Sequence, residues 1–197
     1  MDTSGQVLTI LILGYLLGSI PFAKLFTFRS GVDLFETGTG NPGAANVFRK
    51  VDRRTGVAVF VADALKGAVP ILLAWLMGAP ADLWFIGGWA AVAGHWYPLF
   101  NGFRGGAGLA SGAGVVLALM PVGGLIGILA GAAVLAKVKS SGHAALVGLI
   151  VIVVTTALFN SDWPIGAEWS AIMSAPVLAT ILFARASLRG WKPGRKD

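Results

Sequence analysis

Cysteine is absent from this chain of 197 residues, and charged side chains make up only 12% of it. Disulfides, thiolate nucleophiles and cysteine-ligated metals are therefore excluded, while the redox compartment stays undetermined. The sequence has two histidines, His95 and His143, and no acidic cluster lies between them to complete a metal ligand set. No nucleophile elbow and no Ser-His-Asp arrangement is visible. We expect a protein without a metal or another cofactor, and we interpret His143 as structural.

Polar residues are scarce as well. Hydrophobic residues make up 56% of the chain and its mean hydropathy is +0.78, which is more apolar surface than a soluble domain of this size can bury. A helix needs roughly 20 residues to cross a hydrocarbon layer of about 30 Å, so the length allows about six to eight spans. The sequence predicts an all-α polytopic membrane protein, with one transmembrane domain over residues 1–197.

Apolar runs interrupted by Gly, Pro and charged residues predict seven transmembrane helices. We place them at residues 6–26, 56–78, 83–99, 107–120, 122–138, 143–160 and 168–184. The N-terminus carries Asp2 as its only charge before Lys24, unlike a signal peptide, so we expect the first run to remain as a span. No internal repeat is visible, which counts against many transporter folds.

The weakest boundary lies within residues 108–139, where one long helix would serve nearly as well as a hairpin broken at residues 120–124. Charge favours the hairpin, because a single span would leave Lys137 and Lys139 on the side opposite to the other bases. Three glycines recur every four residues along the second helix of this hairpin, and we expect another backbone to pack closely against them. They are Gly123, Gly127 and Gly131.

The basic residues set the orientation of this path. All 15 Lys and Arg fall on one side of it, and the net charge is +6. By the positive-inside rule this side is the cytoplasm, which puts the N-terminus outside and the C-terminus inside. We therefore expect a multi-pass protein of the cell inner membrane, with charges that serve topology and not nucleic-acid binding.

The loop over residues 38–49 combines glycines with polar side chains. By letter it matches the dinucleotide fingerprint G-x-G-x-x-G, but a membrane span precedes it where the fingerprint needs a strand. Its glycines can still let backbone N–H groups converge on an anion. The matching glycines are Gly38, Gly40 and Gly43, and the side-chain donors are Thr39, Asn41 and Asn46. Arg49 adds a forked cation suited to phosphate. The alternative is an interfacial turn in which Arg49 serves topology.

Asp63 and Lys66 lie three residues apart in the second span, hence on one helical face. Ionisable groups inside a membrane are costly and usually functional. We expect Asp63 to orient Lys66 or Arg49 toward a phosphate. The alternative is a self-neutralising structural pair.

A second glycine-rich turn follows the third span and opens the next helix, whose N-terminal N–H groups form a natural anion site. It contains Arg104 and the glycines Gly105, Gly106 and Gly108. His95 precedes it at the cytoplasmic end of the third span, where it is either a satisfied hydrogen-bonding residue or an active one. Two such sites on one membrane face indicate an enzyme with an anionic substrate.

At these residues the chain resembles the bacterial integral-membrane glycerol-3-phosphate acyltransferases that use acyl phosphate as donor. The resemblance runs nearly end to end, through residues 18–22, Asp33, residues 38–49, 63–67 and 94–108. It implies seven spans and transfer of an acyl group to the 1-hydroxyl of glycerol 3-phosphate at the cytoplasmic face, giving lysophosphatidic acid for phospholipid biosynthesis. Acyl phosphate, glycerol 3-phosphate and membrane lipid are the partners implied, without nucleic acid or an obligate protein partner.

The resemblance also assigns the site residues. The implied catalytic residues are His95, Thr39 and Asn41. The implied phosphate-binding residues are Gly38, Gly40, Gly43, Asn46, Arg49, Asp63, Lys66, Arg104, Gly105, Gly106, Gly108 and Ser187.

The chain departs from the family pattern at several of its positions. The family usually has Arg at Phe35, Ser at Thr39, Thr at Ala45 and Lys at Ala107. Its Arg-His-x-x-Asn-Ile segment aligns best with residues 183–188, which puts Ala184 at the histidine and Ser187 at the asparagine. A charged hydrogen bond contributes roughly 1.5 to 3 kcal/mol, so these losses matter. Two alternatives therefore stand beside the acyltransferase: a catalytically silent or altered-acceptor relative, and a small organic-anion transporter.

Overall fold

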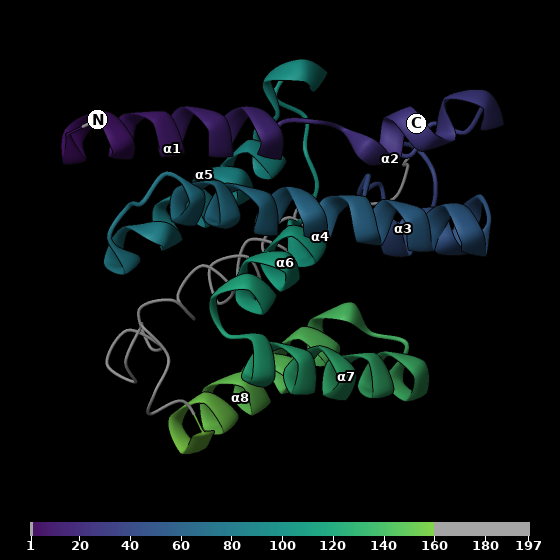
Figure 1. The fold of residues 1–197 in the computed structure, drawn as a ribbon. Helices are drawn as coiled ribbons and strands as arrows, with labels where there is room; N and C mark the ends of the chain where they lie inside the picture. Colours follow the sequence, from purple (N-terminus) through teal and green to yellow (C-terminus); the bar gives the residue numbers. More distant parts are fainter. Residues whose placement is uncertain (1, 160–197) are drawn as a thin grey trace.

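The computed structural model describes residues 2–159, which form helices and turns and contain no strand (Figure 1). The α-helices are α1 (Thr3–Gly18), α2 (Phe22–Thr27), α3 (Ala44–Lys50), α4 (Arg53–Leu76), α5 (Trp84–Trp96), α6 (Leu109–Leu119), α7 (Pro121–Val138) and α8 (Ser141–Phe159). Short 3-10 turns lie at Phe28–Ser30, Ala81–Leu83 and Leu99–Asn101. The all-α prediction is confirmed for these residues. The seventh predicted span, Ala184 and Ser187 lie outside the described residues.

Within residues 2–159, three segments are long and apolar enough to cross a membrane: Thr3–Ser30, Arg53–Leu76 and Pro121–Val138. Two shorter apolar helices, Leu109–Leu119 and Gly142–Thr156, accompany them. Large apolar side chains on the outer faces are exposed, such as Leu8 at 59% and Leu129 at 60%. Exposure on this scale is unfavourable in water and favourable against lipid tails.

The first predicted span, 6–26, is broken near its end. Helix α1 ends at Gly18, and the short helix α2 begins at Phe22. Pro21 lies between the two helices; proline has no N–H to donate, and it disfavours the helical conformation for the residue before it, Ile20. The break frees the carbonyl oxygen of Ile20, which accepts a hydrogen bond from Lys66 Nζ at 2.9 Å.

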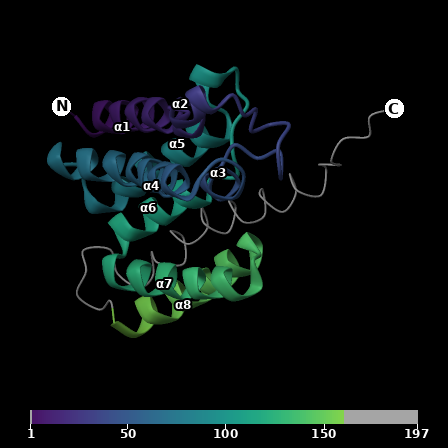
Figure 2. The ribbon, with the colours of Figure 1, turned by 90° about the vertical axis from the view of Figure 1, so that its right-hand side faces the viewer.

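The predicted break between two helices is confirmed, while their passage through a membrane as a hairpin stays a prediction. Helix α6 ends at Leu119 and α7 starts with Pro121, whose missing N–H costs nothing at the first helical position. Helices α7 and α8 lie side by side in both views (Figures 1 and 2). A Cβ on Gly127 would lie 2.6 Å from the carbonyl oxygen of Gly148, and one on Gly131 would lie 2.8 Å from that of Ala144. The expected close backbone approach is therefore confirmed, and α8 is the partner.

Close packing of α4, α5 and α6 determines the position of the candidate site. Gly67 of α4 lies directly against the backbone of Ser111 in α6, and Gly114 of α6 lies against the backbone of Ala64. A side chain at either glycine would push the two helices apart. The same three helices share an apolar core with Ile71, Val92, Val115, Val116, Leu119 and Met120. Polar groups on their facing surfaces are thereby brought within hydrogen-bonding reach.

Candidate active site

Four buried polar side chains meet between α4, α5 and α6. Asp63 Oδ1 lies 2.9 Å from Lys66 Nζ, as expected for side chains three apart on one helix, and 3.8 Å from His95 Nδ1. Ser111 Oγ lies 3.2 Å from the same nitrogen of His95. Every member of the cluster is buried. An ion pair inside an apolar bundle persists only where further polar contacts complete it, and this cluster has them.

Lys66 reaches out of this cluster toward the break between α1 and α2. Besides its bond to Ile20, its ammonium lies 5.8 Å from the centre of the Phe22 ring. The predicted common face of Asp63 and Lys66 is confirmed by their ion pair. Whether the pair orients a phosphate or is structural stays a prediction.

The loop over residues 38–49 is folded around Asn46, which is buried. Asn46 Nδ2 donates to the carbonyl oxygens of Leu34 at 3.2 Å and Thr37 at 2.8 Å. Its Oδ1 accepts from the backbone N–H of Thr39 at 3.3 Å. Gly38 has φ of 66°, in the left-handed region, and the second half of the loop, from Ala44 on, belongs to α3. The amide of Asn46 is committed to shaping the loop.

The turn over residues 104–108 is held by groups outside it. The N–H of Gly106 donates to the carbonyl oxygen of His95 at 3.2 Å, and Trp96 Nε1 donates to the carbonyl oxygen of Ala107 at 3.2 Å. Gly105 lies directly against the carbonyl oxygens of His95 and Trp96, which leaves no room for a side chain. A Cβ on Gly106 would lie 2.6 Å from His95 Nε2, so this edge of the imidazole faces the turn.

Asn41 joins the two loops. Its Oδ1 accepts a hydrogen bond from the backbone N–H of Ala107 at 3.2 Å, across 66 positions of sequence. The two glycine-rich segments that the sequence indicates as anion sites are thus brought into contact. This hydrogen bond holds the two predicted anion sites next to each other.

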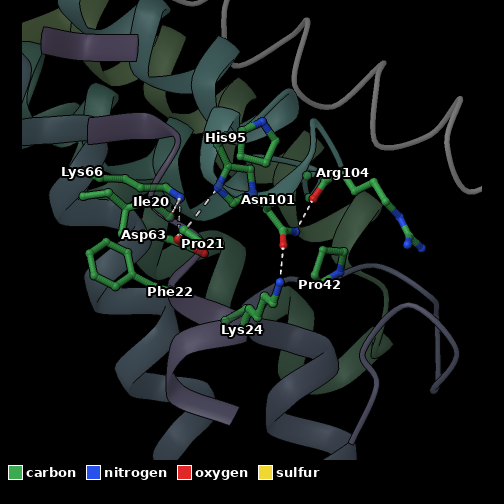
Figure 3. Close-up of a pocket in the computed structure, with 14 residues that line it drawn as sticks. Ile20, Pro21, Phe22, Lys24, Pro42, Asp63, Lys66, His95, Asn101 and Arg104 are labelled. Carbon is green, nitrogen blue, oxygen red and sulfur yellow. Dashed lines mark hydrogen bonds and ion pairs between the residues drawn. The ribbon is translucent and has the colours of Figure 1, made fainter. Parts of the chain in front are cut away.

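A small hollow, partly open to solvent, lies where these elements meet (Figure 3). Six predicted site residues line the hollow: Asp63, Lys66, His95, Arg104, Gly105 and Gly106. The 38–49 loop contributes Pro42. Other predicted residues are not part of the hollow's lining, namely Gly38, Thr39, Gly40, Asn41, Gly43, Asn46, Arg49 and Gly108.

The two predicted arginines are both exposed, and they are arranged differently. Arg49 Nε donates to the carbonyl oxygen of Ala45 at 3.0 Å within α3. The Arg104 guanidinium carbon lies 4.2 Å from the centre of the Phe35 ring, a cation–π contact. In Figure 3 the side chain of Arg104 points away from Lys66 and His95. Phe35, which stands where the family usually has a cation, therefore holds the guanidinium of Arg104.

Sequence reasoning missed Lys24 and Asn101. Lys24 was interpreted only as a topology charge, yet both residues line the hollow and bond to each other. One signal was present: Pro21 inside the first span predicts a helix break, and a basic residue three positions later then lies on a separate short helix. Asn101 carries no comparable signal in the sequence.

Among residues 2–159, no three His, Cys, Asp or Glu side chains gather in a way that could hold a metal ion. His143 is exposed, and its Nδ1 lies 2.8 Å from Ser140 Oγ at the start of α8. This contact joins residues three positions apart at the start of α8.

Comparisons with known proteins agree along nearly the whole chain. The family model described as Glycerol-3-phosphate acyltransferase matches residues 8–189. A glycerol-3-phosphate acyltransferase of Pseudomonas paraeruginosa is 38% identical over 190 residues, which are 94% of this chain and 95% of that protein. One from Geobacter metallireducens is 49% identical over 113 residues, which are 57% of this chain and only 58% of that protein.

The structure is similar to a crystal structure of PlsY, an integral membrane glycerol 3-phosphate acyltransferase, in its glycerol 3-phosphate form. The TM-score is 0.77 at 32% sequence identity, and the match covers 93% of this chain and 92% of that chain. A second crystal structure of PlsY, in the lysophosphatidic acid form, matches with a TM-score of 0.74 at 33% identity over 88% of this chain and 87% of that chain.

Proposed function

The chain belongs to the glycerol-3-phosphate acyltransferase family, and from this premise we propose that it transfers an acyl group from acyl phosphate to the 1-hydroxyl of glycerol 3-phosphate. The products are lysophosphatidic acid and inorganic phosphate, so the reaction serves phospholipid biosynthesis. The relatives named for this acceptor support the proposal.

One observation carries the proposal most directly: the two glycine-rich loops meet beside a buried histidine. Asn41 Oδ1 accepts from the N–H of Ala107, and His95 Nε2 faces Gly106 in the same turn. Transfer between two phosphate-bearing substrates needs two anion sites separated by one reacting centre. Adjacent loops with a basic ring between them meet that need.

Acyl phosphate is already activated, so the protein needs mainly to position the substrates and stabilise the developing oxyanion. The acceptor's hydroxyl oxygen bonds to the acyl carbon, and the bond from that carbon to the phosphate oxygen breaks. His95 Nε2 takes the hydroxyl proton and returns it to the departing phosphate. Ser111 Oγ, 3.2 Å from Nδ1, can accept the N–H of that nitrogen, which leaves Nε2 as the basic one.

The remaining roles follow from the polar groups beside the hollow. We assign the donor's phosphate to the 38–49 loop and Arg49, and the acceptor's phosphate to the 104–108 turn and Lys66. Asn41 holds the 104–108 turn in place through its bond to Ala107, and the hydroxyl of Thr39 donates to the reacting carbonyl. Asn46 shapes the 38–49 loop, and Asp63 holds Lys66.

We also propose seven spans in the inner membrane, with the N-terminus outside and the site facing the cytoplasm. The start of α4 and the end of α7 both carry basic residues. These two helix ends lie at one end of the bundle (Figure 1). Cysteine labelling in intact cells tests the orientation. A cysteine at Asp82 should react with an impermeant reagent, while one at Arg53 should not; the reverse pattern would defeat this topology.

The activity is tested with purified protein in lipid nanodiscs, given glycerol 3-phosphate and acyl phosphates of several chain lengths. We expect lysophosphatidic acid and phosphate to form in equal amounts, and His95→Gln to abolish both while the protein stays folded. The departures at Phe35 and Ala107 favour one other function, a silent or altered-acceptor relative. If folded wild type produces no lysophosphatidic acid from any donor, that second function replaces the first.

A further inference from the structure

Three basic side chains line the hollow: Lys24, Lys66 and Arg104. The three side chains differ in the groups that already contact their charge. Lys66 is paired with Asp63 at 2.9 Å, and the Arg104 guanidinium lies over the Phe35 ring. Lys24 forms no ion pair with any group in residues 2–159. Its full positive charge is therefore available to an anion.

Lys24 is nevertheless held in place. Its Nζ donates to Asn101 Oδ1 at 3.0 Å, and Asn101 Nδ2 donates to the carbonyl oxygen of Arg104 at 2.7 Å. Figure 3 shows the ammonium pointing to Asn101, between Pro42 and Pro21. The amide of Asn101 thus fixes the cation against the 104–108 turn without neutralising it, because an amide oxygen carries no net charge.

Lys24 lies on a short helix of its own. Pro21 ends the continuity of α1, and Lys24 lies on the separate helix α2 after the break.

We propose that Lys24 binds the phosphate of the acceptor and that Asn101 is the residue that positions it. This proposal rests on the proposed function. Lys24 provides, from α2, a cation beside the turn in which Ala107 carries none. The ligand recognised here is a phosphate monoester dianion, bound by an ammonium group together with the N–H groups of the 104–108 turn.

The test compares Lys24→Met with Arg29→Met. Lys24→Met keeps most of the aliphatic stem and removes the charge at an exposed position, so the fold should persist. Arg29 is an exposed base in the turn after α2 and does not line the hollow, which makes it the matched control. We expect Lys24→Met to raise the KM for glycerol 3-phosphate about five- to tenfold, with little change in kcat or in the KM for acyl phosphate. Arg29→Met should change each value less than about twofold.

Asn101 gives a second variant, and its combination with Lys24→Met distinguishes a role through Lys24 from a merely structural one. Asn101→Asp keeps the size and the bond to Lys24, neutralises the ammonium with a carboxylate, and also removes the donor to the carbonyl oxygen of Arg104. It should raise the KM for the acceptor at least as much as Lys24→Met. Added to Lys24→Met, it should no longer act through Lys24, so the two changes should combine non-additively.

Direct binding of glycerol 3-phosphate, measured by calorimetry without a donor, separates the two proposals. If wild type is active and Lys24→Met leaves acceptor affinity and KM within twofold of wild type, the role of Lys24 is overturned while the function stands. If wild type transfers no acyl group but binds glycerol 3-phosphate more tightly than Lys24→Met does, the role of Lys24 stands and the function fails. Absence of both binding and transfer overturns both.

Discussion

The two glycine-rich loops reach the same place in the molecule by opposite means. The 38–49 loop is organised from within: Asn46, from α3, bonds to three backbone groups of the segment before it. The 104–108 turn is organised from outside, by the backbone of His95, the indole of Trp96 and the amide of Asn41. One loop is self-supporting, and the other takes its shape from its neighbours.

Because of this difference, a polar side chain in a loop is not necessarily available to a ligand. Asn46 looks like a donor for a ligand in the sequence, yet its Nδ2 already donates to the carbonyl oxygens of Leu34 and Thr37, just before the loop. The 104–108 turn has few side-chain donors, yet it lies against the imidazole of His95. The candidate chemistry therefore lies closer to the loop with fewer polar side chains.

The largest effect on activity should come from Gly105→Ala, which disturbs the 104–108 turn. The added Cβ would overlap the carbonyl oxygens of His95 and Trp96, both of them backbone atoms that cannot swing away. A displacement of the turn by about 1 Å should lower kcat/KM about a hundredfold. Steady-state kinetics in nanodiscs measure this.

Gly102→Ala is the matched control. Gly102 has φ of 59° and nothing within 4 Å of an added Cβ, so this change brings backbone strain of roughly 1 to 2 kcal/mol without a collision. Its kcat/KM should fall only a fewfold. Equal losses for the two variants would show that the contact with His95 does not shape the turn.

The second effect concerns the self-supporting loop. Asn46→Ala removes three hydrogen bonds and leaves the carbonyl oxygens of Leu34 and Thr37 without their amide partner. Each lost partner of a buried group costs about 1 to 3 kcal/mol. We expect a lower midpoint of thermal unfolding and a raised KM for acyl phosphate, with a smaller change for the acceptor. An unchanged unfolding midpoint would mean that the loop does not depend on Asn46.

The third effect separates two exposed arginines near the end of the first loop. Arg49 is the last residue of the loop and lies in α3, whereas Arg53 starts α4 and lies 5.9 Å from the centre of the Phe48 ring. Arg49→Ala should raise the KM for acyl phosphate about tenfold, because a charge-assisted contact to phosphate is lost. Arg53→Ala should change it less than about twofold. Equal changes would argue that the loop is an interfacial turn.

The smallest effect should come from the link between the loops. Asn41→Ala removes the bond to the N–H of Ala107, and a neutral hydrogen bond contributes about 0.5 to 1.5 kcal/mol. Because this bond joins both anion sites, the KM values for donor and acceptor should rise together by a fewfold. A rise confined to one substrate would show that the loops act independently.

The order of the helices was predictable because it depends on local composition. The break at Met120 was predicted from the placement of Lys137 and Lys139, and the glycine face of α7 from a four-residue repeat, and both are confirmed. The boundary at Pro21 was missed, although proline chemistry favours it. Hydropathy averages over a window and so overlooks a single break in an apolar run.

What the sequence by itself determined is the helical architecture, the family, and the two glycine-rich segments with their nearby cations, because these depend on residue type and spacing along the chain. Only the tertiary structure decided what these donors contact: Asn46 bonds to the carbonyl oxygens of Leu34 and Thr37, Arg104 lies over Phe35, and Lys24 bonds to Asn101 in the lining of the hollow. The physical reason is that a hydrogen bond or cation–π contact requires both partners within a few ångströms, and only the folded chain brings these separated positions together.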